Sequence, residues 1–396
     1  MTARSVDEPH RASSPLELLV DLTFVVAVAS ITARLAAGIA GGDALAELTP
    51  FLQVFFAIWW AWMNFTWFAS SYDTDDVPYR ILTMVQMAGV LVLAAGVPAG
   101  FGNGDYRAIT VGYLIMRVGL VAQWLRAGRE DPASRRTAFR YALGISIVQV
   151  GWLARLGLAE AGVLGSASLP AFLGLVACEL AVPPWAERAR PTSWHPHHIA
   201  ERYGLFVIIL LGESVLAAST GVQAASAAGA GVSPSLVTIA LGGLVLLFAL
   251  WWLYFLEPAG EGLARRRHGS FLWGYGHYGI FAALAATGAG LEVAVEQAGH
   301  PLDVSVTSAG YAVAIPVCVF LVLLWGVHAP IVARPVIPPV LILGAAVLVA
   351  VTPLAGELVG LPTVIGSIAV LCAALVGTTI LSRPAGRTEG LAELDA

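Results

Sequence analysis

The chain has 396 residues, of which 58% are hydrophobic and only 12% are charged. Soluble globular domains carry roughly 25% charged residues, so about half of the usual solvating charge is missing. This composition excludes a disordered chain, a nucleic-acid-binding protein and an ordinary soluble enzyme. It predicts an all-α polytopic membrane protein whose main partner is the lipid bilayer.

Apolar stretches long enough to cross a membrane recur along the whole chain. A bilayer core takes about 20 apolar residues in a helix, which gives about 12 transmembrane helices here. Glu17 and Asp21 interrupt the first stretch, so we expect an uncleaved helix there rather than a signal peptide. The expected spans are 16–38, 50–71, 79–98, 107–126, 137–157, 167–185, 200–220, 234–256, 271–295, 305–328, 335–354 and 361–381.

The positive charges follow this topology. All 21 basic residues are arginines. If the N-terminus is cytoplasmic, 17 of these 21 arginines fall on the cytoplasmic side, Arg34, Arg107 and Arg155 fall outside, and Arg117 lies within a span. The positive-inside rule therefore predicts a multi-pass protein of the inner (plasma) membrane with both termini in the cytoplasm.

The two halves of the chain resemble each other. Glu17 and Ser30 align with Glu201 and Ser214 at an offset of 184, and later matches drift to an offset of 201. Six spans return a chain to the same side, so the halves are expected to be parallel repeats, as in some transporters. The alternative is that apolar helices resemble one another by composition alone. The expected divisions are an N-terminal tail at 1–15, repeats at 16–190 and 195–383, and a C-terminal tail at 384–396.

The first span carries two acidic residues. Ser14, Pro15 and Glu17 form a capping-box pattern, so Glu17 has either a capping role or a role in chemistry. Asp21 lies one helical turn further on the same face, about 6 Å deeper. An aspartate at that depth needs a partner, because exposure to lipid would cost a few kcal/mol.

A second polar group opens the seventh span. His198, Glu201 and Arg202 lie within about one turn of one another, which predicts either a polar cluster at the cytoplasmic mouth or an intrahelical surface cluster. The histidine run that begins at His195 has no accompanying carboxylate or cysteine ligand at a diagnostic spacing. We therefore predict no metal site, and no cofactor motif is present.

Two further charges lie deep in apolar sequence. Glu213 follows Glu201 by about 18 Å of helix, which places it past the bilayer midplane, and Gly212 beside it would permit close approach of another backbone. Arg117 lies about 15 Å into the fourth span and is the expected opposite charge. The two would form either a structural ion pair or part of a proton or solute site.

His277 lies in the ninth span. Its imidazole would either relay protons near neutral pH or act as a hydrogen-bonded core histidine. The nearby Gly276 and Gly279 favour close helix packing. Three amides are expected to form hydrogen bonds between helices, namely Asn64, Gln86 and Gln123. Each of the doublets Trp59–Trp60 and Trp251–Trp252 is expected to turn one ring toward the interior.

These motifs resemble the bacterial low-temperature-requirement protein A (LtrA) family. The resemblance is carried by ELLVDLTFVVAVAS from Glu17, by HIAERYGLFVIILLGES at 198–214, by WWLYF at 251–255 and by the pair Tyr275 and His277. The family pattern maps onto Glu17, Asp21, His198, Glu201, Arg202, Gly212, Glu213, Ser214, Trp252, Tyr254, Phe255 and His277. The family expectation of an acidic residue directly after Phe255 is not met, because Leu256 precedes Glu257.

The resemblance implies an integral membrane protein associated by name with growth in the cold, and it implies no reaction. We expect a proton-linked, permease-like carrier of a small solute or ion rather than an enzyme, with a path between the halves. The residues expected to handle the solute or protons are Asp21, Arg117, Glu213 and His277, with Glu17, His198, Glu201 and Arg202 as further candidates. The alternative is a non-transporting structural or sensory membrane protein that supports growth at low temperature.

Overall fold

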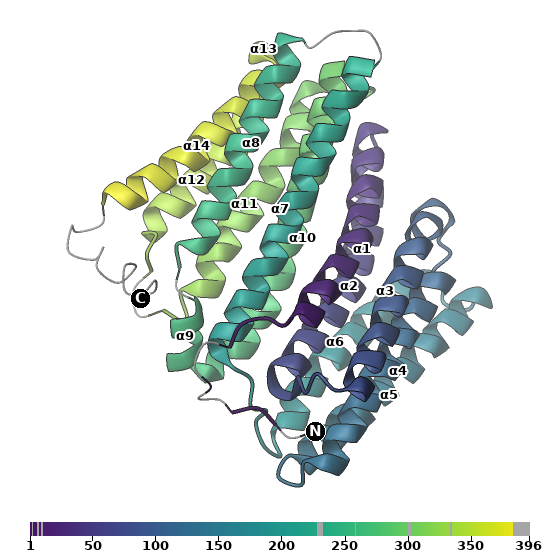
Figure 1. Cartoon of the computed structure of the whole chain (residues 1–396). Coiled ribbons are helices and arrows are strands. Elements are labelled where there is room, and N and C mark those ends of the chain that lie inside the picture. Colours follow the sequence, from purple (N-terminus) through teal and green to yellow (C-terminus); the bar gives the residue numbers. More distant parts are fainter. Residues whose placement is uncertain are drawn as a thin grey trace. The chain divides into compact units, whose positions relative to one another are not determined.

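The computed structural model describes residues 1–382 apart from 2, 6–7, 9–10, 228–232, 258, 300–301 and 333–334, and it leaves out the side chains of 218, 220–222 and 224–227. The described part of the chain folds into helices and connecting segments without a strand (Figure 1). The long helices are α1 (Pro15–Ala40), α2 (Ala44–Tyr72), α3 (Val77–Asn103), α4 (Arg107–Glu130), α5 (Arg135–Glu160), α6 (Ser168–Glu187), α7 (Pro196–Ala227), α8 (Pro234–Phe255), α10 (Ser270–Gly299), α11 (Val306–His328), α12 (Pro339–Val351) and α14 (Leu361–Leu381). The short ones are α9 (Ala259–Arg265) and α13 (Gly356–Val359), with 3-10 turns at Gly165–Ala167, Arg267–Gly269 and Thr352–Ala355.

The helices match the predicted spans one for one. Among the described residues, 11 helical segments are long and apolar enough to cross a membrane. The seventh predicted span falls on α7, which is 32 residues long. The all-helical, multi-pass architecture is therefore confirmed. The two-repeat arrangement stays a prediction, and the C-terminal tail at 384–396 lies outside the described residues.

The eleventh predicted span is not one continuous α-helix. Helix α12 ends at Val351, and the chain continues through the 3-10 turn that contains Pro353 into α13. Proline lacks the backbone N–H that would continue the α-helical ladder, and its ring clashes with the preceding turn. The span is thus completed by three successive helical segments.

The helices form two compact units. The first comprises 1–38, 43–210 and 263–271, and the second comprises 39–42, 211–262 and 272–396. Helix α7 contributes its beginning to the first unit and its remainder to the second.

In the first unit, glycines bring α3 and α4 into backbone contact. A Cβ atom on Gly112 would come within 2.4 Å of the Leu93 nitrogen and 2.5 Å of the Gly89 carbonyl oxygen. Small residues give van der Waals contact between helices where lipid supplies no hydrophobic drive for association. Any larger side chain at Gly112 would force these two helices apart.

Amides add hydrogen bonds to the same helix pair. Gln86 on α3 donates to Gln123 on α4 at 2.9 Å, and Gln123 donates to Thr83 at 3.1 Å. The prediction for these two glutamines is confirmed. The prediction for Asn64 is wrong, because its amide donates within α2 to the Trp60 carbonyl oxygen at 2.7 Å.

In the second unit, α8 and α14 run side by side (Figure 1). A Cβ atom on Gly242 of α8 would lie 3.4 Å from the backbone of Gly366 on α14. The interior prediction for the second tryptophan doublet is wrong, since Trp251 and Trp252 are 43% and 46% exposed at the surface of α8. In the first doublet both Trp59 and Trp60 are buried.

The start of α3 yields a test of helix capping. Asp76 accepts a hydrogen bond from the Tyr79 nitrogen at 3.0 Å and two from Arg126 at 2.6 Å. These contacts hold the pKa of Asp76 well below its usual range, with the Arg126 hydrogen bonds as the largest cause. Asp76→Ala is expected to lower the free energy of unfolding by about 1–2 kcal/mol at pH 7.

The pH dependence of this loss follows from the sign of the pKa shift. A carboxyl with a depressed pKa stabilises the fold above its unfolded pKa, and this stabilisation fades as the pH falls through the folded value. Thermal unfolding in detergent should therefore show the two proteins converging below about pH 4. Asp75→Asn, at an exposed pair with Arg80, is the control. A difference that is constant with pH would contradict this account.

Candidate functional site

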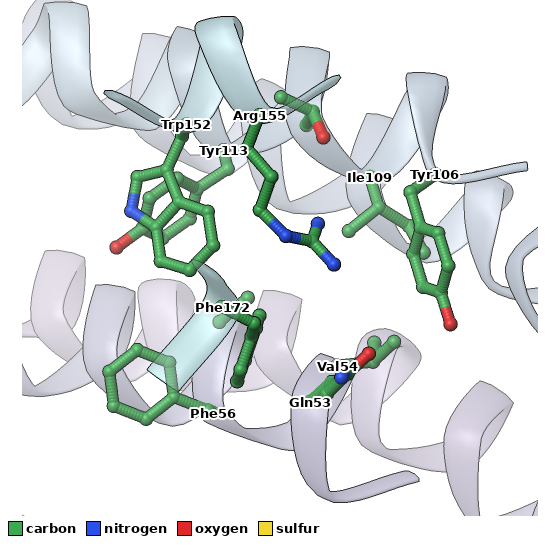
Figure 2. Close-up of a pocket in the computed structure, with 11 residues that line it drawn as sticks. Gln53, Val54, Phe56, Tyr106, Ile109, Tyr113, Trp152, Arg155 and Phe172 are labelled. Carbon is green, nitrogen blue, oxygen red and sulfur yellow. The ribbon is translucent and has the colours of Figure 1, made fainter. Parts of the chain in front are cut away.

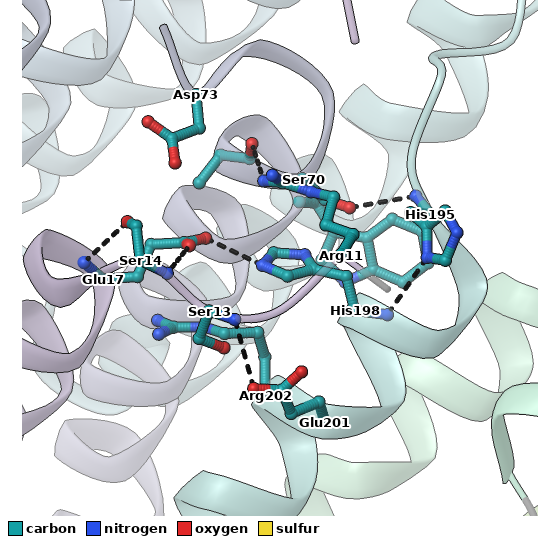
Figure 3. A network of polar contacts seen from close by, with 12 residues as sticks. Arg11, Ser13, Ser14, Glu17, Ser70, Asp73, His195, His198, Glu201 and Arg202 are labelled. Atoms are coloured by element: carbon teal, nitrogen blue, oxygen red, sulfur yellow. Dashed lines mark hydrogen bonds and ion pairs between the residues drawn. The ribbon is translucent and has the colours of Figure 1, made fainter. Parts of the chain in front are cut away.

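Two carboxylates of α1 meet two basic side chains of α7 within the first unit. Figure 3 shows the first of these contacts, between Glu17 and His198. Glu17 Oε1 lies 3.0 Å from His198 Nε2, and all of Glu17 and His198 is buried. One turn further along both helices, Asp21 Oδ1 accepts from Arg202 Nη2 at 2.7 Å. We call these four residues the α1–α7 cluster.

The spacing of four residues on each helix explains this arrangement. Residues i and i+4 lie on the same face of a helix, so Glu17 and Asp21 face α7 together while His198 and Arg202 face α1. Trp62 of α2 also donates to Asp21 Oδ1, at 2.8 Å. The sequence predicted that Asp21 needs a partner, and Arg202 and Trp62 are its partners.

Glu17 combines the two roles that the sequence left open. The Ser14 nitrogen donates to Glu17 Oε2 at 2.8 Å, and the Glu17 nitrogen donates to Ser14 Oγ at 3.3 Å, which is the reciprocal capping box. The other carboxylate oxygen contacts His198. Capping fixes the carboxylate at the start of α1, where it meets α7.

Glu201 is not part of the α1–α7 cluster. Its side chain is exposed and accepts a hydrogen bond from the Ser13 nitrogen at 3.1 Å. The sequence predicted that His198, Glu201 and Arg202 form one cluster, either at the mouth of the span or on the helix surface. In the structure His198 and Arg202 are buried, whereas Glu201 is exposed and does not join them. An α-helix places adjacent residues about 100° apart, which separates Glu201 from Arg202.

His195 has a structural role at the start of α7. Its Nδ1 accepts from the His198 nitrogen at 3.3 Å, and its own nitrogen donates to Ser70 Oγ at 3.0 Å. A side-chain acceptor before Pro196 satisfies a free N–H of the first helical turn. Three or more potential ligand side chains do not gather anywhere among the residues that the structure describes.

A third buried ion pair joins α4 to α6 in the first unit. Arg117 Nη2 lies 3.3 Å from Glu179 Oε1, and both side chains are 2% exposed. Glu179 Oε1 also accepts from Tyr113 at 2.7 Å and from Trp152 at 3.1 Å, while Oε2 accepts from Trp60 at 2.8 Å. The Arg117 guanidinium stacks 4.4 Å from the centre of the Tyr113 ring and donates to its hydroxyl. We call these five residues the Glu179 cluster.

A pocket of the first unit ends on this cluster (Figure 2). It encloses about 500 Å³, including its opening. Trp152 and Tyr113 line it and also donate to Glu179. Helices α2, α4, α5 and α6 supply the wall, which consists of Gln53, Val54, Phe56, Ala57, Tyr106, Ile109, Thr110, Tyr113, Trp152, Arg155 and Phe172. Two side chains therefore link the pocket to the buried Arg117–Glu179 pair, which does not itself line it.

Glu213 belongs to the second unit and has different surroundings from those expected. The carboxylate that Arg117 contacts is Glu179 rather than Glu213. Glu213 is half-buried, and its charge acts on Glu292 of α10, which is another carboxylate. A Cβ atom on Gly212 would meet nothing within 4 Å, so the expectation of close backbone approach there is wrong. The close contact is made two residues further on, at Ser214, whose Oγ would lie 2.4 Å from a Cβ atom on Gly288.

His277 lies in a buried aromatic group of the second unit. Its Nδ1 lies 2.7 Å from the Trp273 carbonyl oxygen, and its Nε2 lies 3.1 Å from the Tyr254 hydroxyl. A second buried histidine, His328 of α11, has its ring 5.7 Å from the His277 ring. Nδ1 of His328 lies 3.0 Å from the Leu324 carbonyl oxygen. Of the two roles considered for His277, a proton relay and a hydrogen-bonded core histidine, these contacts fit the second.

The glycines beside His277 account for its burial. Cβ atoms on Gly276 and Gly279 would lie 2.4 Å from Val327 and Leu323 of α11, so the predicted close packing of this helix is confirmed. Glu257, at the position where the family pattern is shifted, accepts from the Val336 nitrogen at 2.8 Å. It binds the backbone just before α12.

The predicted site residues thus fall into separate groups. Asp21 belongs to the α1–α7 cluster and Arg117 to the Glu179 cluster, while Glu213 and His277 lie in the second unit among other partners. Neither Glu179 nor His328 is among the residues predicted from the sequence. Each is an ionisable residue inside an apolar span, and this criterion, applied to all twelve spans, would have found both.

Comparison with known proteins supports the sequence resemblance. The family described as bacterial low temperature requirement A protein (LtrA) matches residues 12–378, which is nearly the whole chain. An uncharacterized protein of Rhizobium meliloti (strain 1021) is 30% identical over 304 residues, covering 71% of this chain and 68% of that protein.

The Asp21–Arg202 pair gives a test of coupling within the α1–α7 cluster. Asp21→Asn leaves a buried guanidinium without its carboxylate and should lower the free energy of unfolding by about 3–5 kcal/mol. The double variant Asp21→Asn with Arg202→Gln removes both charges and should lose less than the sum of the single losses. Thermal unfolding in detergent measures the cycle. Glu201→Gln, beside Arg202 but exposed, is the control, and additive losses would show that the pair is not coupled.

His195 gives a test of pH dependence at the start of α7. Burial is the largest cause that lowers its pKa below the ordinary value, and the positive charges of His197, His198 and Arg11 act in the same direction, while Glu8 opposes them. Since the folded pKa is lowered, neutral His195 stabilises the fold above about pH 6.5, and this contribution is lost as the pH falls further.

The unfolding temperature in detergent should therefore fall between about pH 7.5 and pH 5. Asn keeps an acceptor for the cap and does not titrate, so His195→Asn should flatten this dependence. The matched control is His197→Asn at the exposed neighbour. An unchanged slope in His195→Asn would assign the pH dependence to other groups.

Proposed function

The chain belongs to the bacterial low temperature requirement A (LtrA) family, and we propose that it is a multi-pass membrane carrier for a small solute. Its solute site is the pocket of the first unit that ends on the Glu179 cluster. The carrier lies in the inner (plasma) membrane with both termini in the cytoplasm, in accordance with the arginine distribution.

One observation carries this proposal: an open pocket among apolar helices is lined by two side chains that donate to the carboxylate of a buried ion pair. Charges inside a membrane are costly and usually mark solute or ion pathways. A solute in the pocket would touch Tyr113 and Trp152, and both donate to Glu179. Its arrival would alter hydrogen bonds that join α4, α5 and α6, which gives the solute a means of changing how these helices pack.

Proton coupling is assigned to the α1–α7 cluster. Histidine is the side chain whose ordinary charge change falls near neutral pH. Glu17 and His198 form a buried carboxylate–imidazole pair that is able to hold one proton between two helices. A path through Asp21, Arg117, Glu213 and His277 together is not part of the proposal, because these residues have separate partners.

The rival function is a non-transporting structural or sensory membrane protein. It is favoured by the pairing of Glu17, Asp21 and Glu179 with basic partners, since such pairs also hold helices together. The two functions differ in whether solute crosses the membrane. Flux is therefore the deciding measurement.

The test is uptake into proteoliposomes that contain a pH-sensitive dye and carry a pH gradient. A panel of radiolabelled monocarboxylates, amines, amides and sugars is supplied outside. At least one solute class is expected to enter faster than into protein-free liposomes and to move protons with it. Glu179→Gln should slow this uptake by about tenfold or more, because the charge that Tyr113 and Trp152 bind behind the pocket is lost.

Cys178→Ala is the matched control, since Cys178 is the exposed neighbour of Glu179 on α6 and should leave uptake unchanged. Circular dichroism and gel filtration establish that each variant is folded. If Glu179→Gln does not fold, Trp152→Phe, which removes one donor to Glu179, takes its place. Absence of uptake across the panel by folded wild-type protein would overturn the carrier proposal in favour of the rival.

A further inference from the structure

The geometry points to an organic monocarboxylate with an aromatic body as the ligand of the first-unit pocket. This inference rests on the proposed function only in that it concerns the same pocket. It follows from one basic side chain, from the charge balance of the pocket and from its aromatic wall.

Arg155 of α5 is the cation that the ligand would meet. Its guanidinium points into the pocket space between Ile109 and Phe172 (Figure 2). The guanidinium carbon lies 5.5 Å from the centre of the Phe172 ring, and Nη2 donates to Ser168 Oγ at 3.2 Å. Its Nε is buried and has no hydrogen-bond partner. Within the described chain, no carboxylate oxygen lies within 4 Å of Arg155, whereas Arg107 and Arg117 both have one.

The charge balance of the pocket favours a ligand with a single negative charge. Arg117 and Glu179 neutralise each other below the pocket, so Arg155 leaves one positive charge in excess. The charge of Glu47 acts on Tyr106 at this pocket and not on Arg155. A planar carboxylate matches the two-pronged donor geometry of a guanidinium. A dianion such as a phosphate monoester would leave one charge uncompensated in an apolar site.

The aromatic wall of the pocket favours a ligand with an aromatic group. Phe56, Tyr106, Trp152 and Phe172 present aromatic surfaces around the space. Aromatic groups bind such surfaces in offset or edge-to-face packing. Thr110 lies on the same wall and adds a hydroxyl group.

The experiment measures binding to the full-length protein in nanodiscs at pH 7 by calorimetry, so it does not depend on transport. The probes are phenylacetate, phenylacetamide, phenethylamine and acetate, which vary the charge and the aromatic body separately. Phenylacetate is expected to bind saturably and at least about tenfold more tightly than each of the other three. Arg155→Gln should weaken phenylacetate by about tenfold or more and leave phenylacetamide unchanged.

Arg140→Gln is the matched control, because Arg140 lies on the same helix over Trp185 and outside the pocket. It should leave phenylacetate binding unchanged. Arg155→Lys keeps the charge without the planar fork and should fall between wild type and Arg155→Gln.

Three results would overturn the inference: no saturable binding of phenylacetate up to about 20 mM, equal binding of phenylacetamide, or tighter binding of phenethylamine. Unchanged phenylacetate binding in folded Arg155→Gln would overturn it as well. Binding of phenylacetate without uptake of any solute would support the inferred ligand and count against the carrier function. Uptake of another solute class without phenylacetate binding would support the carrier function and overturn the inferred ligand.

Discussion

The cost of placing charge in an apolar surrounding governs this structure. A single buried charge among membrane helices costs several kcal/mol unless another charge or a set of hydrogen bonds compensates it. The first unit meets this constraint with pairs on neighbouring helices: Glu17 with His198, Asp21 with Arg202 and Glu179 with Arg117. Each pair fixes which faces of two helices meet, which apolar contacts alone would leave weakly specified.

The same constraint distinguishes the compensated charges from Arg155. The three pairs are compensated inside the protein, whereas Arg155 lies in a pocket without a carboxylate beside it in the described chain. Its guanidinium donates to Ser168 and lies over the Phe172 ring. A ligand that filled the pocket would have to bring the missing negative charge. This is the physical link between the proposed site and the class of ligand inferred for it.

The sequence predicted the helices well and the partners of the polar side chains poorly. Spans follow from length and hydropathy, which are local, and all twelve predicted spans correspond to helices. Asp21 was recognised as a residue in need of a partner because its depth follows from helical rise. That Arg117 meets Glu179 rather than Glu213 depends on which helices are neighbours and how each is rotated. These are tertiary properties that one sequence does not contain.

The glycine contacts of α3 and α4 have a consequence for temperature. Hydrophobic stabilisation weakens on cooling, because it depends on the structure of water. Helices in lipid associate instead through van der Waals packing and hydrogen bonds, which have no such dependence. The backbone contact of Gly89 with Gly112 and the amide pair of Gln86 with Gln123 are of this second kind. This helix pair is therefore built from interactions that keep their strength in the cold.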